Sequence, residues 1–194
     1  IPGAQAVIGD RVWRDSDADG VQDPGEPGEP GVTVKLYFTT SPDPAMTAVT
    51  DAEGLYRFPE LDPSVAYFLE FVAPSGFAFT RNDAGSDDAI DSDADRITGR
   101  TPPFTPLSGD NPTWDAGLIE LASISGSVWR DSNADGIRGG NEPLLADQRV
   151  YLDLDGDATW DADEPSMKTD AQGSFRFEGL LPGTPVPAGR RPLP

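Results

Sequence analysis

The chain has 194 residues, of which 34 are acidic and 14 are basic, and its formal net charge is −20 at pH 7. This acidity excludes a general nucleic-acid binder, which needs a positive surface for phosphates, and it disfavours insertion into anionic membranes. The complete lack of cysteine and histidine excludes disulfides, thiolate or Ser–His catalysis and nearly every zinc or copper site, which leaves cations with oxygen ligands as partners.

The first predicted strands recur later in the chain. The segment Ile8–Val21 resembles Ile124–Ile137, and Thr50–Phe58 resembles Thr169–Phe177. Such self-similarity is typical of repeated domains. We therefore expect two tandem domains, over residues 1–119 and 123–194.

The residue pattern favours strands throughout. Gly and Pro contribute 21 and 20 residues, which is typical of a chain rich in turns, and no stretch has a long helical period. The turns Asp51–Gly54 and Asp170–Gly173 are expected to close hairpins. The fold predicted is all-β, with two antiparallel β-sandwiches. The expected strands include residues 32–38, 55–58, 66–72 and 148–153.

The second copy differs from the first after Leu180. Its tail, residues 182–194, is rich in proline, and proline cannot donate a hydrogen bond within a central strand. The second domain is therefore expected to lack its last strands. Either the chain has been cut, or a partner supplies the missing edge.

Residues 15–26 fit a twelve-residue calcium-binding loop position by position. Gly20 stands at the sixth position, where the chain must turn sharply, and Glu26 stands at the twelfth, where a carboxylate can bind through both oxygens. The predicted calcium ligands are Asp15, Asp17, Asp19, the carbonyl of Val21, Asp23 and Glu26.

The same pattern occurs twice more. In the third loop Ala158 stands where glycine is expected, which makes the required turn harder to form. Water is expected at the ninth position of the second loop. The predicted ligands are Asp131, Asn133, Asp135, the carbonyl of Ile137 and Glu142 in the second loop, and Asp153, Asp155, Asp157, Thr159, Asp161 and Glu164 in the third.

A fourth acidic segment has a similar start, at Asp91, Asp93 and Asp95, but Arg96 replaces the glycine. It is either a weaker calcium site or a solvated loop. Trp13 and Trp129 precede two of the loops. They are expected to pack the strand that leads into each loop, although an exposed indole could instead bind a sugar.

These motifs also carry a family resemblance. Ile8–Asp15, the calcium loop, Gly31–Leu36, Thr50–Phe58 and Asp91–Asp93 resemble the B domains of serine–aspartate-repeat surface adhesins, the SdrD B-like branch of the collagen-adhesin B-type fold. The resemblance implies a prealbumin-like β-sandwich with structural calcium that acts as a stalk or spacer outside the cell. Some relatives contain a Lys–Asn isopeptide bond, but Lys35 is expected to face outward and to form none.

The sequence predicts a calcium-stiffened structural spacer of an extracellular, cell-surface or matrix protein, without enzymatic activity. Its expected partners are calcium ions and neighbouring domains or like subunits, with no nucleic acid and no membrane insertion. Two alternatives stay open. One is a subunit of a self-assembling filament that is completed by strand donation, and the other is a glycan- or protein-binding adhesin module.

Overall fold

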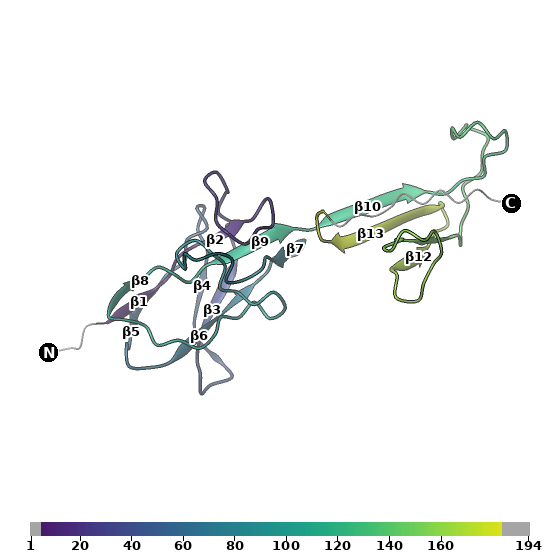
Figure 1. Cartoon of the computed structure of the whole chain (residues 1–194). Helices are drawn as coiled ribbons and strands as arrows, with labels where there is room; N and C mark the ends of the chain where they lie inside the picture. The colour runs from purple at the N-terminus through teal and green to yellow at the C-terminus, as the bar shows by residue number, and fades with distance from the viewer. Residues whose placement is uncertain (1–4, 184–194) are drawn as a thin grey trace. The chain divides into compact units, whose positions relative to one another are not determined.

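A computed structural model describes residues 5–183, which divide into two compact units between Leu121 and Ala122 (Figure 1). The described residues form strands β1 to β13 and no helix, so the predicted all-β class is confirmed. Accordingly, no described helix is long and apolar enough to cross a membrane.

The first unit contains nine strands in three small sheets. The sheets have the orders β5-β1-β8, β2-β9-β7 and β4-β3-β6. The strands are β1 (Ala6–Ile8), β2 (Val12–Arg14), β3 (Thr33–Phe38), β4 (Pro44–Val49), β5 (Phe58–Leu61), β6 (Tyr67–Val72), β7 (Phe77–Phe79), β8 (Gly109–Asn111) and β9 (Ala116–Glu120).

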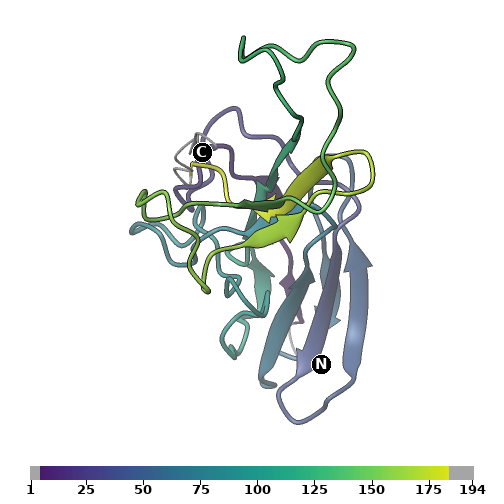
Figure 2. The same ribbon diagram turned by 90° about the vertical axis from the view of Figure 1, so that its right-hand side faces the viewer.

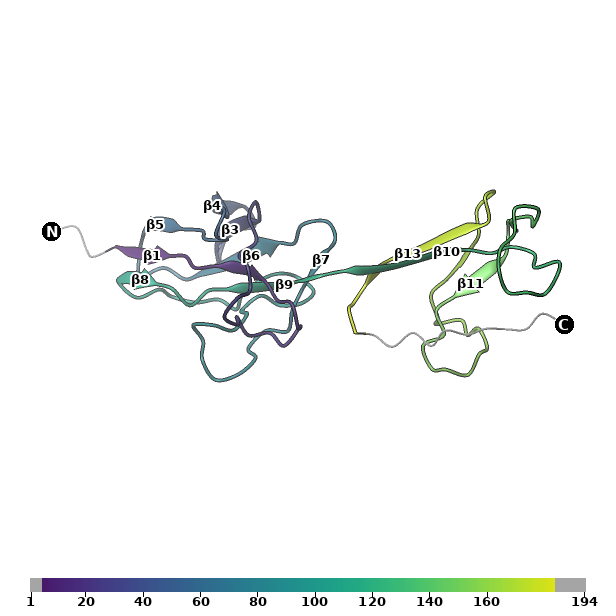
Figure 3. The same cartoon turned by 90° about the horizontal axis from the view of Figure 1, so that it is seen from above.

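Two layers enclose the core of this unit. Strands β1 and β2 follow each other along the chain, and β8 and β9 run beside them (Figure 3), so the first two sheets continue one layer. Alternate residues of this layer and of β4-β3-β6 meet in one buried cluster, as strand periodicity requires. Its fully buried members include Ile8, Val12, Val34, Leu36, Leu69 and Leu118.

Two pairings differ from the antiparallel arrangement that was predicted. Strands β1 and β8 run parallel, and so do β2 and β9. Parallel neighbours need a long crossover connection, and about a hundred residues separate the members of each pair in the chain. Such long-range pairing leaves no local turn signal in the sequence.

The Asp51–Gly54 turn does not close a hairpin, which corrects the prediction. It carries the chain from β4 in one layer to β5 in the other. The Asp51 carboxylate accepts hydrogen bonds from the N–H groups of Glu53 (3.0 Å) and Leu55 (2.8 Å). These bonds hold Leu55 in the turn, so the strand predicted over 55–58 begins only at Phe58.

The second unit has fewer strands. Strands β10 (Ala122–Ser127) and β13 (Ser174–Leu180) form one pair, and β11 (Arg149–Tyr151) and β12 (Ser166–Lys168) form the other. Ile124 is 37% exposed, whereas its counterpart Ile8 is fully buried. Of the proline-rich tail, residues 184–194 lie outside the described residues.

Candidate metal centre

The three acidic loops close in the same way. In each, the residue before the first position donates its N–H to the carbonyl of the proline that follows the twelfth-position glutamate. Each loop therefore starts and ends at one hydrogen-bonded stem, which brings its two ends together. The donor–acceptor pairs are Arg14–Pro27 (2.9 Å), Arg130–Pro143 (2.9 Å) and Leu152–Pro165 (3.0 Å).

The backbone turns at the same places in all three loops. The fourth and sixth positions have left-handed φ angles in each loop, a conformation that costs little only for glycine. In the third loop glycine occupies the fourth position instead of the sixth, and Ala158 still adopts the left-handed turn. The φ angles are 63° and 85° at Ala18 and Gly20, 58° and 74° at Ala134 and Gly136, and 79° and 62° at Gly156 and Ala158.

The first-position carboxylates are fixed by this turn. Each accepts a hydrogen bond from the N–H of the sixth residue, which holds the carboxylate beside the inside of the loop. The donor and acceptor pairs are Gly20 and Asp15 (2.8 Å), Gly136 and Asp131 (2.8 Å), and Ala158 and Asp153 (3.0 Å).

The twelfth-position glutamates fold back across their loops. Glu26 accepts the N–H of Ser16 at one oxygen (2.6 Å) and the N–H of Asp23 at the other (3.0 Å). Glu142 and Glu164 make the equivalent pairs of bonds at 2.8–3.1 Å. Both oxygens of each glutamate therefore lie near the loop interior, where a calcium ion takes a bidentate carboxylate.

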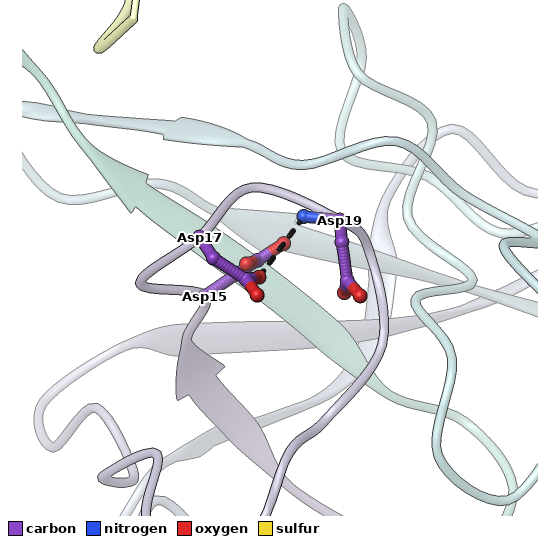
Figure 4. A group of neighbouring side chains, drawn as sticks. All are labelled: Asp15, Asp17 and Asp19. Carbon is purple, nitrogen blue, oxygen red and sulfur yellow. Dashed lines mark hydrogen bonds between the residues drawn. The ribbon is translucent and has the colours of Figure 1, made fainter.

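The loops differ in how closely their carboxylates approach. Oxygens of Asp15, Asp17 and Asp19 lie within 4.8 Å of one another (Figure 4). The third loop has two such groups, of which one includes Glu164 and the other Asp161. In the second loop Asn133 replaces one carboxylate, and its amide donates to Asp135 (2.8 Å).

Like charges in these groups oppose ionisation. Desolvation, followed by repulsion from Asp19, raises the pKa of Asp17. Desolvation and repulsion from Asp157 raise the pKa of Asp161 in the same way. A divalent cation would remove this repulsion, and hard carboxylate and carbonyl oxygens are the donors that calcium prefers. The residues present therefore fit calcium.

We expect Ala158→Gly to stabilise the second unit by about 1 kcal/mol, because glycine adopts the left-handed turn without strain. Gly136→Ala should destabilise by a similar amount, since an added Cβ at Gly136 meets no atom within 4 Å and only the backbone cost changes. Urea unfolding at fixed calcium concentration measures both. Equal stability of Ala158→Gly and the unaltered chain would contradict the shared backbone geometry.

The three carboxylates of the fourth acidic segment differ in their hydrogen bonds. The Asp95 carboxylate accepts the N–H groups of Ile97 (3.1 Å) and Thr98 (2.8 Å), and these bonds lower its pKa. Asp93 accepts the N–H of Asp115 (2.6 Å). Asp91 keeps one buried oxygen without a hydrogen-bond partner in the described structure. A weaker calcium site at Asp91, Asp93 and Asp95 stays a prediction.

Sequence reasoning missed two further acids, the buried Asp115 and the half-buried Asp10. Burial raises the pKa of Asp115 to about 9 and that of Asp10 to about 6. Burial also raises the pKa of the predicted ligand Asp93 to about 8. Asp115 lies between Trp114 and Ala116 at the start of a buried strand. These apolar neighbours are the one feature of the sequence that could have indicated its burial.

The pKa of Asp10 gives a pH-dependent prediction. Because the folded value of about 6 exceeds the ordinary value of 3.8, the proton stabilises the fold below pH 3.8, and this contribution is lost as the pH rises through 6. Asp10→Asn should therefore stabilise the first unit at pH 8, by about 1 kcal/mol after allowance for solvent screening.

Urea unfolding at pH 4 and pH 8 in a chelator checks this prediction. The exposed Asp110, which pairs with Arg57, supplies the control: Asp110→Asn should not reproduce the gain. A loss of stability in Asp10→Asn at pH 8 would contradict the predicted sign.

The two tryptophans before the loops and Lys35 differ in how far they are buried. Trp13 is fully buried, so it packs the strand as expected and offers no face to a sugar. Trp129 is partly buried. Lys35 faces outward and pairs with Glu70 (2.9 Å).

Comparisons with known proteins find a matching family model and several relatives. The family model described as "SdrD B-like domain" matches residues 6–118. The chain is 34% identical over 179 residues to serine-aspartate repeat-containing protein F of Staphylococcus epidermidis, and over 180 residues to protein D of Staphylococcus aureus strain Newman. Each match covers 91% of the chain but only 10% and 13% of these relatives.

Solved structures are more distant. A streptococcal ancillary pilin is 15% identical, with a TM-score of 0.46, and the match covers 93% of this chain and 52% of the pilin. The Bacillus anthracis TIE protein is 12% identical with a TM-score of 0.41, covering 90% of this chain and 26% of that protein.

Proposed function

Because the chain belongs to the SdrD B-like domain family and is homologous to staphylococcal serine–aspartate-repeat surface proteins, we propose that it is a calcium-binding structural spacer. Its place is extracellular, at the cell surface. The family is a non-enzymatic module of surface adhesins, and the proposed role assigns the chain no reaction. The chain spans about a tenth of its relatives' length.

One observation carries the proposal: three loops of different sequence share the same stem, the same two left-handed turns and the same glutamate bonds. A solvated acidic turn has no need of this arrangement. In each loop we assign the first, third, fifth and twelfth side chains and the seventh carbonyl as calcium ligands. The ninth position contributes directly in the first and third loops, and through water in the second.

Calcium would act on the strands that the loops join. The first loop starts at the end of β2, and the residues after it return to β2, because Glu29 donates its N–H to the carbonyl of Val12 (2.8 Å). The third loop connects β11 to β12. An ion that fixes a loop therefore fixes its two stems, and binding to the folded state alone raises folding stability.

We also propose that residues 123–194 are a second copy of the same domain. The antiparallel pair β10–β13 corresponds to β1–β5, and β11–β12 corresponds to β3–β4. Both units carry an acidic loop at the same place, over residues 15–26 in the first unit and 131–142 in the second. Two units stiffened in the same way suit a spacer, which must transmit force without a reaction of its own.

Limited trypsin digestion tests the proposal. Arg138 lies inside the second loop and is exposed, and the first and third loops contain no basic residue. Calcium should slow cleavage after Arg138, because an ion-filled loop cannot open into the protease. In Glu142→Gln the same bond should be cut at one rate with and without calcium. Equal cleavage of the unaltered chain in calcium and in chelator would count against the spacer mechanism.

A further inference from the structure

Strand β4 is the outer strand of the sheet β4-β3-β6, and Figure 2 shows it as the outermost arrow beside β3. Its six residues, Pro44–Val49, include no charged side chain. Met46 is 36% and Val49 60% exposed. An uncharged, partly apolar edge of this length is unusual, because natural proteins protect sheet edges from pairing with other chains.

The other edges of the first unit are protected. The free side of β6 is covered by residues 99–104, since Phe71 donates to Gly99 and Phe104 donates to Tyr67 (both 2.8 Å). β5 contains a proline and a glutamate, β8 is three residues long with Asp110 at its centre, and β7 is also three residues long. In β4 the one proline stands at the first residue and no side chain is charged, so the edge over Met46–Val49 stays open to pairing.

The backbone of β4 is arranged to pair. Thr50 donates its N–H to the carbonyl of Val32 (3.0 Å), so the backbone groups of Thr50 point toward β3. In an antiparallel ladder these groups alternate in direction, and those of Thr47 and Val49 consequently point outward. Neither is a proline, so both can donate. A bulge opposite Leu36 and Tyr37 confines the regular edge to Met46–Val49.

We propose that this edge pairs antiparallel with the same edge of a second copy of the chain, which joins two three-stranded sheets across a two-fold axis. An antiparallel strand is complementary to itself, so the pairing needs no other protein.

Charge repulsion between two copies is expected to be smallest at this edge. Two copies with a net charge of −20 repel each other over most of their surface, but β4 adds no charge. Lys35 is paired across to Thr47, and Lys35 and Arg100 both bond to Glu70 beside it. The outer face of this sheet is therefore less acidic than the chain as a whole.

Sedimentation velocity over a concentration series, in calcium and physiological salt, tests the proposal. The sedimentation coefficient of the unaltered chain should rise with concentration, and Thr47→Glu should keep the monomer value at every concentration. The new carboxylate faces Lys35 within its own sheet, so the fold is retained, while pairing would bring two such carboxylates together. Thr47→Gln, which has the same shape without the charge, should still associate.

Ser125→Glu is the matched control, because Ser125 of β10 lies opposite Arg176 as Thr47 lies opposite Lys35. It should associate like the unaltered chain. Loss of association in Ser125→Glu but not in Thr47→Glu would assign the contact to β10 and overturn the proposal. A concentration-independent monomer value for the unaltered chain would also overturn it.

A second measurement uses the lack of native cysteine. Thr47→Cys should form a covalent dimer on mild oxidation much faster than Ser125→Cys does. Equal rates for the two variants would contradict pairing at β4, even if Thr47→Glu failed to fold.

Discussion

Adding calcium to the metal-stripped chain should raise its unfolding temperature by roughly 10–20 °C for a unit with one filled site. A site held at a hundredfold excess of calcium over its dissociation constant contributes about 2.7 kcal/mol to the free energy of unfolding. Extracellular modules bind calcium at about 10⁻⁴–10⁻³ M, so about 10 mM calcium is needed to reach this gain at the tight end of that range. Scanning calorimetry in chelator and in a calcium series measures it.

Single-loop variants separate the contributions of the loops to this rise in unfolding temperature. Glu26→Gln should reduce the rise caused by calcium in the first unit only, and Glu164→Gln should reduce it in the second unit only. Magnesium should stabilise much less, because it demands a small octahedral site and loses its water reluctantly. An equal gain in magnesium would indicate general charge screening instead of bound calcium.

Truncation of one isoleucine should affect the two units very differently. Ile8 is fully buried against Phe58, which pairs with it across β1 and β5. Ile8→Ala should destabilise the first unit by about 3 kcal/mol, through lost burial and the cavity left behind. Its counterpart Ile124 is 37% exposed, so Ile124→Ala should cost about 1 kcal/mol or less.

Native-state hydrogen exchange of β3 and β11 reports on the two units separately. Ile8→Ala should accelerate exchange in β3, and Ile124→Ala should leave exchange in β11 nearly unchanged. A larger effect at Ile124 would mean that the second unit is closed by contacts beyond those of the described residues.

The shape of the acidic loops could be predicted because their information is local. Twelve consecutive residues supply the carboxylates, the turns and the closing glutamate, so spacing alone located the three loops. The sixth position was predicted to prefer glycine, and Ala158 adopts the left-handed angle there with φ 62°. Gly156 at the fourth position and the bond from Ala158 to Asp153 produce the same loop.

The arrangement of the sheets was harder to predict from the sequence than the loops were. Residues 32–38 and 66–72 were predicted as strands and are observed as β3 and β6 with small shifts at their ends. The parallel pairing of β2 with β9 depends on residues about a hundred positions apart, and no local pattern records it. The hydrogen bond from Asp115 to Asp93 could not be predicted for the same reason, since the two residues are 22 positions apart.

The central claim is that each acidic loop holds one calcium ion, and titration calorimetry tests it most directly. The unaltered, metal-stripped chain should bind at least one ion for each of the three loops, and Glu26→Gln, Glu142→Gln and Glu164→Gln should each weaken or remove one. The triple variant should lose all three loop sites. An unchanged number of bound ions and unchanged affinities in the triple variant would contradict the account.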